Sequence, residues 1–398
     1  MDRLYLDYAA STPVDPRVFK AMEPYFSEKF GNAGSLHSFG QDAIAAVDHA
    51  RETIAHGIGA AFREVIFTGS ATEANNFVVR GAAQLAGRTA LRNAKIIVSA
   101  IEHESILESA RHLEHEGVEV VYAPVDEQGV VDPEAIAATI DDRTVLVSIM
   151  YANNEIGTIE PVKAIADAIA SFRRKRATSK NPAAYPLFHT DAAQAPQFLT
   201  CRVGDLGVDL MTLSSHKIYG PKGAGVLYAR NPQGMPPLLF GGGQEFGLRS
   251  GTENVPAIVG FGAAFEIAAR MQESERERIG ELKKYLWERI RTIVPDAEVN
   301  GIDPEREPDS QKSLPNILNV YFPKRRSQEL LTKLDLAGLA ISAGSACHSR
   351  AVEPSHVIPA LGYDKERAAS SIRFSLGRPT TRDDIDRALE ILRRVTAE

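Results

Sequence analysis

One lysine of the sequence lies in a short polar segment, Ser214-Ser215-His216-Lys217, between two apolar runs. The run Val208 to Leu213 precedes it and the run Ala224 to Leu227 follows it, so buried strands are expected on both sides. Most lysines are solvated on the surface, which predicts an exposed loop for Lys217. A partly buried lysine can instead have a lowered pKa and form a Schiff base with a carbonyl compound. The spacing alone leaves both interpretations open.

A carboxylate follows another apolar run, in the segment Phe188 to Gln194 that contains Asp191. An aspartate at such a place is commonly the N-cap of a helix, and taken alone Asp191 is best explained in this way. The alternative is a carboxylate that keeps the pyridine nitrogen of a cofactor protonated, so that the ring withdraws electrons. If a helix starts at Asp191, Gln194 lies on the same face three residues later.

A turn of small residues joins a third apolar run to a helical pattern in the segment Phe67 to Glu73. Free backbone N–H groups and the hydroxyls of Ser70 and Thr72 suit a phosphate group at a helix N-terminus. The same residues also form a plain capping arrangement. The spacing GxxxxGK[ST] is absent, so the segment is not a P-loop.

Three further polar positions follow or interrupt apolar runs. His103 either stacks on a flat cofactor ring or is an ordinary polar residue with satisfied hydrogen bonds. The segment Asn153 to Glu155 forms either a turn or a set of ligand donors. Arg373 lies inside an apolar strand and requires a carboxylate partner, from a substrate or from a buried acid.

The sequence contains two cysteines, Cys201 and Cys347. Cys347 lies among small residues in the segment Ser342 to Ser349, which suits an exposed loop where a thiolate reaches a substrate. A buried structural role fits Cys201 better than Cys347. Two cysteines cannot build a disulfide framework or a Cys-rich metal site, so no metal site is predicted.

The elements that must position these residues alternate between strands and helices through the first two thirds of the chain. This alternation predicts an α/β fold with a parallel sheet between helices, in which ligands bind at the carboxyl ends of the strands. The predicted strands are 65–67, 96–98, 118–122, 144–150 and 187–188, and the predicted helices are 72–87, 104–116, 132–140 and 161–176.

A second pattern begins with a long helical region, 256–294, for which a break is expected near Glu273. The charged stretch 303–312 is expected to be an exposed loop. The remainder predicts a smaller α+β domain that includes the N-terminal segment, with strands 316–322, 339–342 and 371–376 and helices 327–336 and 382–396.

The composition of the 398-residue chain, with 44% hydrophobic and 24% charged residues, is that of a globular protein. The net charge of −7 argues against binding to a nucleic acid, and the short basic stretch 174–186 is expected to be a solvated helix end and loop. No secretory signal and no apolar run long enough to span a membrane are recognised, so a cytoplasmic enzyme is expected.

In this order along the chain, the motifs resemble those of the NifS/IscS-type cysteine desulfurases. They extend over residues 4–396 and comprise Tyr5 to Pro13, Ala71 to Glu73, Glu102-His103, Asn153 to Glu155, Asp191 to Gln194, Ser214 to Lys217, Arg249 to Thr252, Gly344 to Cys347 and Arg373. The resemblance implies a homodimer of the pyridoxal 5′-phosphate (PLP) fold-type I, similar to aspartate aminotransferase. It implies a large domain of residues 15–258 with a mostly parallel central sheet, and a small domain of residues 1–14 and 259–398 with the cysteine loop.

The resemblance also implies the reaction and the role of each site residue. L-cysteine would become L-alanine, and the sulfur would be held as a persulfide on Cys347 for a sulfur-acceptor or scaffold protein, as in iron–sulfur cluster assembly. The implied catalytic residues are Lys217, Cys347 and His103, where Lys217 holds PLP and moves protons, Cys347 attacks the substrate sulfur and His103 stacks on the ring. The implied partners of the pyridine nitrogen and the phenolic oxygen are Asp191 and Gln194. The implied phosphate ligands are Thr72, Ser214, His216 and Thr252 of the partner subunit, and the implied ligands of the substrate carboxylate are Asn154 and Arg373.

The chain departs from the family pattern at three places. The order Gly69-Ser70-Ala71 replaces the usual Ser-Gly-Ala or Ser-Gly-Gly, so Thr72 is a better phosphate ligand than Ser70. Ser215 stands where glycine is usual. The chain ends at Glu398 without the C-terminal extension of many relatives, which leaves the binding of a scaffold protein open.

Two segments, Gly251 to Asn254 and Ala346 to Ser349, are among those that also resemble selenocysteine lyases. The alternative function is therefore conversion of L-selenocysteine to L-alanine and selenide. A catalytically silent scaffold is disfavoured, because the lysine, aspartate, histidine and cysteine of the motifs are all present. An aminotransferase of the same fold would not explain a cysteine among small residues.

Overall fold

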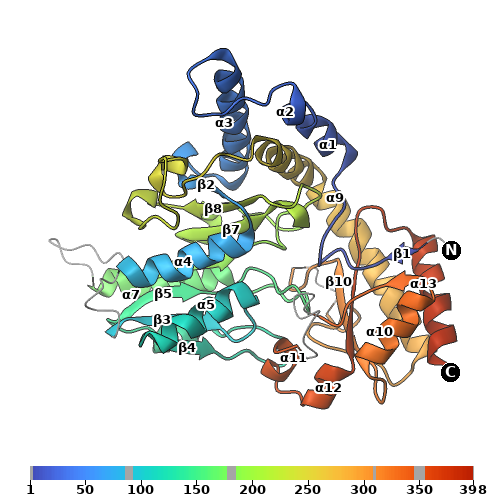
Figure 1. Cartoon of the computed structure of the whole chain (residues 1–398). Helices are drawn as coiled ribbons and strands as arrows, with labels where there is room; N and C mark the ends of the chain where they lie inside the picture. The colour runs from blue at the N-terminus through green and yellow to red at the C-terminus, as the bar shows by residue number, and fades with distance from the viewer. Residues whose placement is uncertain (1–2, 86–92, 177–184, 308–310, 345–354, 398) are drawn as a thin grey trace.

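The computed structural model describes residues 3–85, 93–176, 185–307, 311–344 and 355–397. Figure 1 shows two groups of elements that are joined by the long helix α9 (Val255–Ile293). The first group is built around the largest sheet. The second group contains the smaller sheets and both ends of the chain.

The largest sheet has seven strands among the described residues, in the spatial order β2-β8-β7-β6-β5-β3-β4. The pairs from β7 to β4 are parallel, whereas β8 is antiparallel to both of its neighbours. The predicted α/β fold with a mostly parallel sheet is therefore confirmed. The strands are β2 (Val65–Thr68), β3 (Lys95–Ser99), β4 (Glu119–Ala123), β5 (Thr144–Ser148), β6 (Leu187–Asp191), β7 (Leu210–Ser214) and β8 (Gly225–Ala229).

Helices cover both faces of this sheet. Successive residues of a strand point to opposite faces, and Ile96 and Ile97 of β3 accordingly belong to two separate apolar clusters. Burial on both faces explains why the strands are continuous runs of Val and Ile. The covering helices are α4 (Ala71–Leu85) and α5 (Glu104–His115) on the Ile96 side, and α3 (Ser38–Ile58), α7 (Val162–Arg176) and α9 on the Ile97 side.

Helix α9 has 39 residues and continues through Glu273, so the predicted break was wrong. Polar side chains near this position reach other parts of the fold. Gln272 Nε2 donates a hydrogen bond to the Leu199 carbonyl at 2.9 Å, and Arg278 donates to the Thr380 carbonyl at 2.8 Å. The charged middle of α9 therefore connects the two groups of elements.

The remaining helices of the first group are short. Those that precede α3 were not predicted from the sequence, and α3 itself was not predicted. Among the described residues, no helix combines the length and the apolar character needed to cross a membrane. The short helices are α1 (Pro16–Met22), α2 (Pro24–Ser27), α6 (Pro133–Thr139) and α8 (Val203–Leu206).

The second group contains an antiparallel sheet in the order β12-β10-β9 and the parallel pair β1-β11. Isolated bridges join Asp7 to Ser375 and Ser342 to Arg373, so the N-terminal segment lies beside the C-terminal strand. The domain boundaries at residues 14 and 258 stay a prediction, and the second one falls inside α9. The elements are β1 (Leu4–Tyr5), β9 (Glu298–Val299), β10 (Ile317–Tyr321), β11 (Leu339–Ala340), β12 (Ser371–Ser375), α10 (Ser327–Leu336), α11 (Val357–Ala360), α12 (Lys365–Ala369) and α13 (Arg382–Thr396).

Candidate active site

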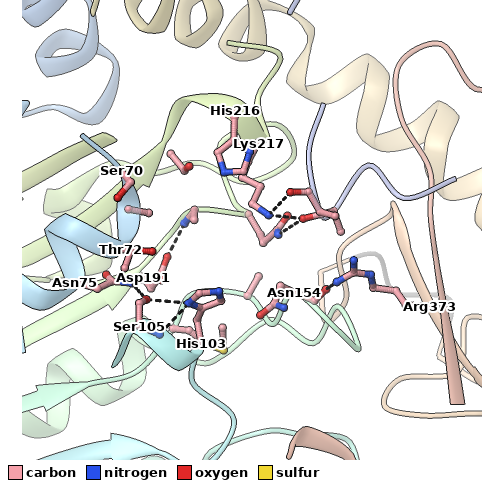
Figure 2. Close-up of a pocket in the computed structure, with 18 residues that line it drawn as sticks. Ser70, Thr72, Asn75, His103, Ser105, Asn154, Asp191, His216, Lys217 and Arg373 are labelled. Carbon is pink, nitrogen blue, oxygen red and sulfur yellow. Dashed lines mark hydrogen bonds between the residues drawn. The ribbon is translucent and has the colours of Figure 1, made fainter. Parts of the chain in front are cut away.

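A cavity of about 200 Å³ lies at the carboxyl ends of β5, β6 and β7. Ligands of parallel α/β sheets bind at this edge. Figure 2 shows side chains that converge on the cavity from the N-terminus of α4, from the strand ends and from β12. The predicted site residues that line it are Thr72, His103, Asn154, Asp191, Gln194, Ser214, His216, Lys217 and Arg373.

Lys217 ends the short 3₁₀-helix η3 (Ser215–Lys217), which follows β7 directly. Its Nζ donates hydrogen bonds to the backbone carbonyls of Ala9 and Ala10 at 2.5 and 2.9 Å. Gln197 Nε2 donates to the Lys217 carbonyl at 2.5 Å and so holds the backbone of this turn. Lys217 is half-buried and lines the cavity, so the exposed-loop interpretation does not apply.

Asp191 is the last residue of β6, and only 6% of its surface is exposed. Asn75 Nδ2 donates a hydrogen bond to Asp191 Oδ2 at 2.7 Å, and the Ala193 N–H donates to Oδ1 at 2.9 Å. The residues that follow Asp191 form turns and no helix starts there, so the N-cap interpretation was wrong. The turn still brings Gln194 to the cavity, where its Nε2 donates to the Ala9 carbonyl at 2.9 Å.

The N-terminus of α4 forms one end of the cavity. Ser70 Oγ accepts a hydrogen bond from the Glu73 N–H at 3.1 Å, so Ser70 caps the helix, while Thr72 lines the cavity two residues later. His216 also lines the cavity, and its Nδ1 lies 3.3 Å from Ser11 Oγ. Burial and the charges of nearby lysines lower the pKa of His216 to about 4. The imidazole is therefore neutral at neutral pH.

His103 is the N-cap residue of α5, and its ring lies in the cavity wall. The Ser105 N–H donates a hydrogen bond to His103 Nδ1 at 3.1 Å, and Ser105 Oγ lies 2.8 Å from the same nitrogen. A ring nitrogen that accepts from a backbone N–H carries no hydrogen, so the neutral ring has its hydrogen on Nε2. Burial lowers the pKa of His103, which favours this neutral form.

Arg373 lies in the middle of β12 with only 1% of its surface exposed. Its guanidinium donates a hydrogen bond to Asp7 Oδ1 at 2.8 Å and another to the Asn154 carbonyl at 2.7 Å. The carboxylate partner that an apolar strand requires is thus supplied by Asp7. Arg373 Nε is buried and has no hydrogen-bond partner within the described part of the chain, and Arg373 is one of the residues that line the cavity.

Two predicted site residues are not among those that line the cavity. Thr252 is exposed on the surface of the chain, and Cys347 lies outside the described residues. Cys201 is buried, and burial raises the pKa of its thiol to about 12. A thiol with this pKa is unreactive at neutral pH, which agrees with the structural role favoured for Cys201.

Three contributors to the site were missed in the sequence. Asn75 follows Thr72 at helical spacing and could have been found from that spacing. Ser105 follows His103 by two residues within the first turn of α5. The carbonyl groups of Ala9 and Ala10 carry no side-chain signal, so only the fold reveals their contact with Lys217.

Comparison with known proteins adds to this geometry. Residues 4–388 match the family described as aminotransferase class-V. The chain is 42% identical over 393 residues to a cysteine desulfurase IscS of Dictyoglomus turgidum, covering 98% of this chain and 94% of that protein. A solved structure called NifS-like protein is 35% identical with a TM-score of 0.88, covering 99% of each chain. A structure of SspA in complex with cysteine is 34% identical with a TM-score of 0.76, covering 94% of this chain and 98% of that one.

Proposed function

Because the chain belongs to the aminotransferase class-V family, in its group of IscS- and NifS-type cysteine desulfurases, we propose that it binds PLP and converts L-cysteine to L-alanine. The sulfur would pass to Cys347 as a persulfide. The observation that carries this proposal is the convergence of Lys217, Asp191 and Arg373 on one cavity. An amine, a buried carboxylate and a guanidinium are the groups that PLP chemistry on an amino acid requires.

The residues around the cavity suit PLP. Asp191 is buried and oriented by two donors, which supports its proposed pairing with a protonated pyridine nitrogen. When bound, PLP withdraws electrons from the substrate Cα. Gln194 would contact the phenolic oxygen and His103 the face of the ring. The phosphate would be held at the N-terminus of α4 by Thr72, Ser214, His216 and Thr252 of the partner subunit.

Lys217 would form the covalent link to PLP. Its Nζ lies in the cavity against the Ala9 and Ala10 carbonyls, which are acceptors that hold the amine in position. As a free amine, Lys217 Nζ would take the proton from the substrate Cα. The same nitrogen would return a proton to the carbon that becomes part of alanine.

Arg373 and Asn154 would bind the substrate carboxylate. Arg373 is planar, permanently charged and already oriented by Asp7, so little conformational freedom is lost when a second carboxylate binds. The amide of Asn154 lines the same cavity and would add a neutral donor. Figure 2 shows Asn154 next to Arg373, which supports a shared role.

Cys347 would accept the sulfur. Its thiolate would attack the substrate sulfur, so that a sulfur–sulfur bond forms and the carbon–sulfur bond breaks. The electron pair of the broken bond stays on the substrate carbon, which then takes a proton to give alanine. Ser342, five residues before Cys347 in the sequence, supports this role. Its carbonyl accepts a hydrogen bond from the backbone N–H of Arg373 at 2.7 Å, so the chain leading to Cys347 passes beside a residue of the cavity. The persulfide would then be passed to an acceptor or scaffold protein, as in iron–sulfur cluster assembly.

A cytoplasmic homodimer is part of the proposal. Large apolar side chains are exposed on the single chain, with exposed fractions of 67% for Phe30, 93% for Leu36 and 86% for Phe240. Such exposure favours a protein–protein interface. Thr252 is also exposed, and in a dimer it would reach the partner's phosphate site.

The function is tested by product analysis. Wild-type protein with PLP should release alanine from L-cysteine and form a protein persulfide, whereas Cys347→Ser should do neither. Cys201→Ser is the matched control, because its buried thiol is unreactive, and it should retain both activities. The IscS relative reported above is named a cysteine desulfurase, and the SspA structure contains cysteine, which favours cysteine over selenocysteine as the substrate. Rapid alanine release from L-selenocysteine, with none from L-cysteine, would contradict the proposal.

A further inference from the structure

Asn75 connects two of the site residues and has no role in the function proposed so far. It lies on α4 and is completely buried. Its Nδ2 donates one hydrogen bond to Asp191 Oδ2 at 2.7 Å and another to Ser105 Oγ at 2.8 Å. A side-chain amide has two N–H groups, so both are used inside the protein.

Ser105 extends this connection to His103. Ser105 Oγ accepts the hydrogen bond from Asn75, which leaves its own hydrogen to point at His103 Nδ1, 2.8 Å away. Figure 2 shows the side chains of Asn75, Ser105 and His103 next to one another near Asp191. The order of donors therefore runs from Asn75 through Ser105 to His103, and it places the hydrogen of the neutral imidazole on Nε2.

The orientation of the Asn75 amide is defined by its surroundings. The reversed orientation would place the amide oxygen against the Asp191 carboxylate, where two acceptors repel each other. In the observed orientation Asn75 Oδ1 is buried without a hydrogen-bond partner in the described ranges of the chain. An unpaired buried acceptor lowers stability, so stability alone does not explain an asparagine at this position.

We propose that Asn75 is a positioning residue, which holds Asp191 in place for the pyridine nitrogen of PLP and, through Ser105, orients His103. This inference rests on the PLP site of the proposed function. It assigns no chemistry to Asn75 itself. The Asn75 amide would thus align Asp191, at the edge of the cofactor ring, with His103, at the face of the ring.

The affinity for PLP, measured by equilibrium dialysis without any amino acid, tests the bond to Asp191. Asn75→Leu keeps the size of the side chain and removes both donors. A hydrogen bond to a charged group is worth about 10- to 100-fold in a binding constant, so PLP should bind more weakly by about that factor. Arg80→Ala, which changes an exposed residue of the same helix, is the control and should bind PLP like the wild type. Wild-type affinity of Asn75→Leu would overturn the proposal.

Asn75→Asp tests whether the hydrogen bond to Asp191, and not only the size of the side chain at position 75, determines PLP affinity. The new carboxyl group would lie beside Asp191, and two carboxyl groups at hydrogen-bond distance share a proton. At acidic pH the protonated group still donates to Asp191, so PLP affinity should be close to that of the wild type. As the pH rises towards 9, repulsion should displace Asp191 and weaken binding relative to the wild type. If the PLP affinity of Asn75→Asp, divided by that of the wild type, is constant between pH 5.5 and 9, the proposal is also overturned.

Ser105→Ala tests the connection from Asn75 through Ser105 to His103. The bond from Asn75 to Asp191 remains, so PLP affinity should fall less than in Asn75→Leu. His103 Nδ1 loses a donor that favours the neutral ring, so the acid limb of the pH profile of alanine release should move to higher pH. The charged and titratable groups that act on His103 are Asp191, Lys217, Glu104 and His356, and all are retained in this variant. An unchanged acid limb would contradict the role of Ser105.

Failure of this inference is distinguishable from failure of the proposed function. The dialysis experiment contains PLP and no substrate. A wild type that binds PLP but releases no alanine from L-cysteine would refute the desulfurase and leave the role of Asn75 standing. A wild type that releases alanine, with Asn75 variants that bind PLP equally well, would refute the role of Asn75 alone.

Discussion

Glu160 allows a quantitative test of the burial of polar groups around the main sheet, because only 2% of its surface is exposed. The Val131 N–H donates a hydrogen bond to Glu160 Oε2 at 2.9 Å, while Oε1 is buried without a partner among the described residues. Burial is the main reason that the pKa of Glu160 rises to about 8, with a small addition from the charge of Asp126. At pH 7 the folded protein therefore holds Glu160 largely protonated.

The effect on stability follows from the difference between this pKa of about 8 and the ordinary value of 4.5. The folded state binds the proton more tightly than the unfolded state. The stabilisation is therefore complete below pH 4.5 and is lost as the pH rises through 8. The gap of 8 minus 4.5 corresponds to about 5 kcal/mol in total, at about 1.4 kcal/mol for each pH unit. Between pH 5.5 and 7.5 the loss should be about 2 to 3 kcal/mol.

Glu160→Gln removes the titration and keeps the shape and the acceptor for Val131. The free energy of unfolding in guanidinium chloride should be measured for both proteins at pH 5.5 and 7.5, with the exposed Glu134→Gln as the control. The stability of Glu160→Gln relative to the wild type should rise by about 2 to 3 kcal/mol over this interval. Any cost of the unpaired amide does not depend on pH and cancels in this comparison. A relative stability that is constant within about 0.5 kcal/mol would refute the reasoning.

Three further variants test other parts of the molecule. Burial lowers the pKa of Lys283 to about 7, so the stability of the wild type falls as the pH falls. In denaturant unfolding, the stability of Lys283→Met relative to the wild type should therefore rise by about 2 kcal/mol when the pH is lowered from 9 to 7.5. Lys217→Ala should lose alanine release and the visible absorbance of lysine-linked PLP, and retention of either would contradict its role. Arg373→Lys should raise KM for L-cysteine by about 10-fold or more, because one ammonium cannot make a bidentate carboxylate contact, and an unchanged KM would remove Arg373 from the substrate site. The wild type should sediment as a dimer, and an active monomer would leave Thr252 without a phosphate to contact.

The central sheet could be predicted because its strands are buried on both faces and therefore form short apolar runs between amphipathic helices. The direction of β8 could not be predicted in this way. Its sequence, Gly225 to Ala229, is an apolar run like the others, and an apolar run has no direction. Only its pairing with β7 and β2 shows that it is antiparallel. The break expected near Glu273 was wrong because polar residues there, such as Gln272 and Arg278, make contacts outside the helix while the helix continues.

The site could be predicted where a side chain lies at the end of a strand or within a few residues after it. Asp191 and Lys217 are of this kind, because a strand end fixes which edge of the sheet a residue occupies. The interpretation of Asp191 as an N-cap failed because it relied on the next few residues, which form a turn. The partner of Arg373 was beyond local reasoning, since Asp7 lies 366 residues earlier in the chain. Contacts of that range depend on the packing of β12 beside the N-terminal segment.

The N-terminal segment determines how the two cationic groups of the cavity are placed relative to each other. Asp7 accepts a hydrogen bond from Arg373, and the carbonyls of Ala9 and Ala10 accept from Lys217. The segment is itself held at both ends, because Asp7 forms a bridge with Ser375 beside β12 and the Thr12 N–H donates to the His216 carbonyl at 3.1 Å. A displacement of this segment would therefore move the amine and the guanidinium together. Since the proposed reaction needs the substrate carboxylate and the substrate Cα at a defined separation, a short stretch of backbone sets that separation more rigidly than two independent long side chains would.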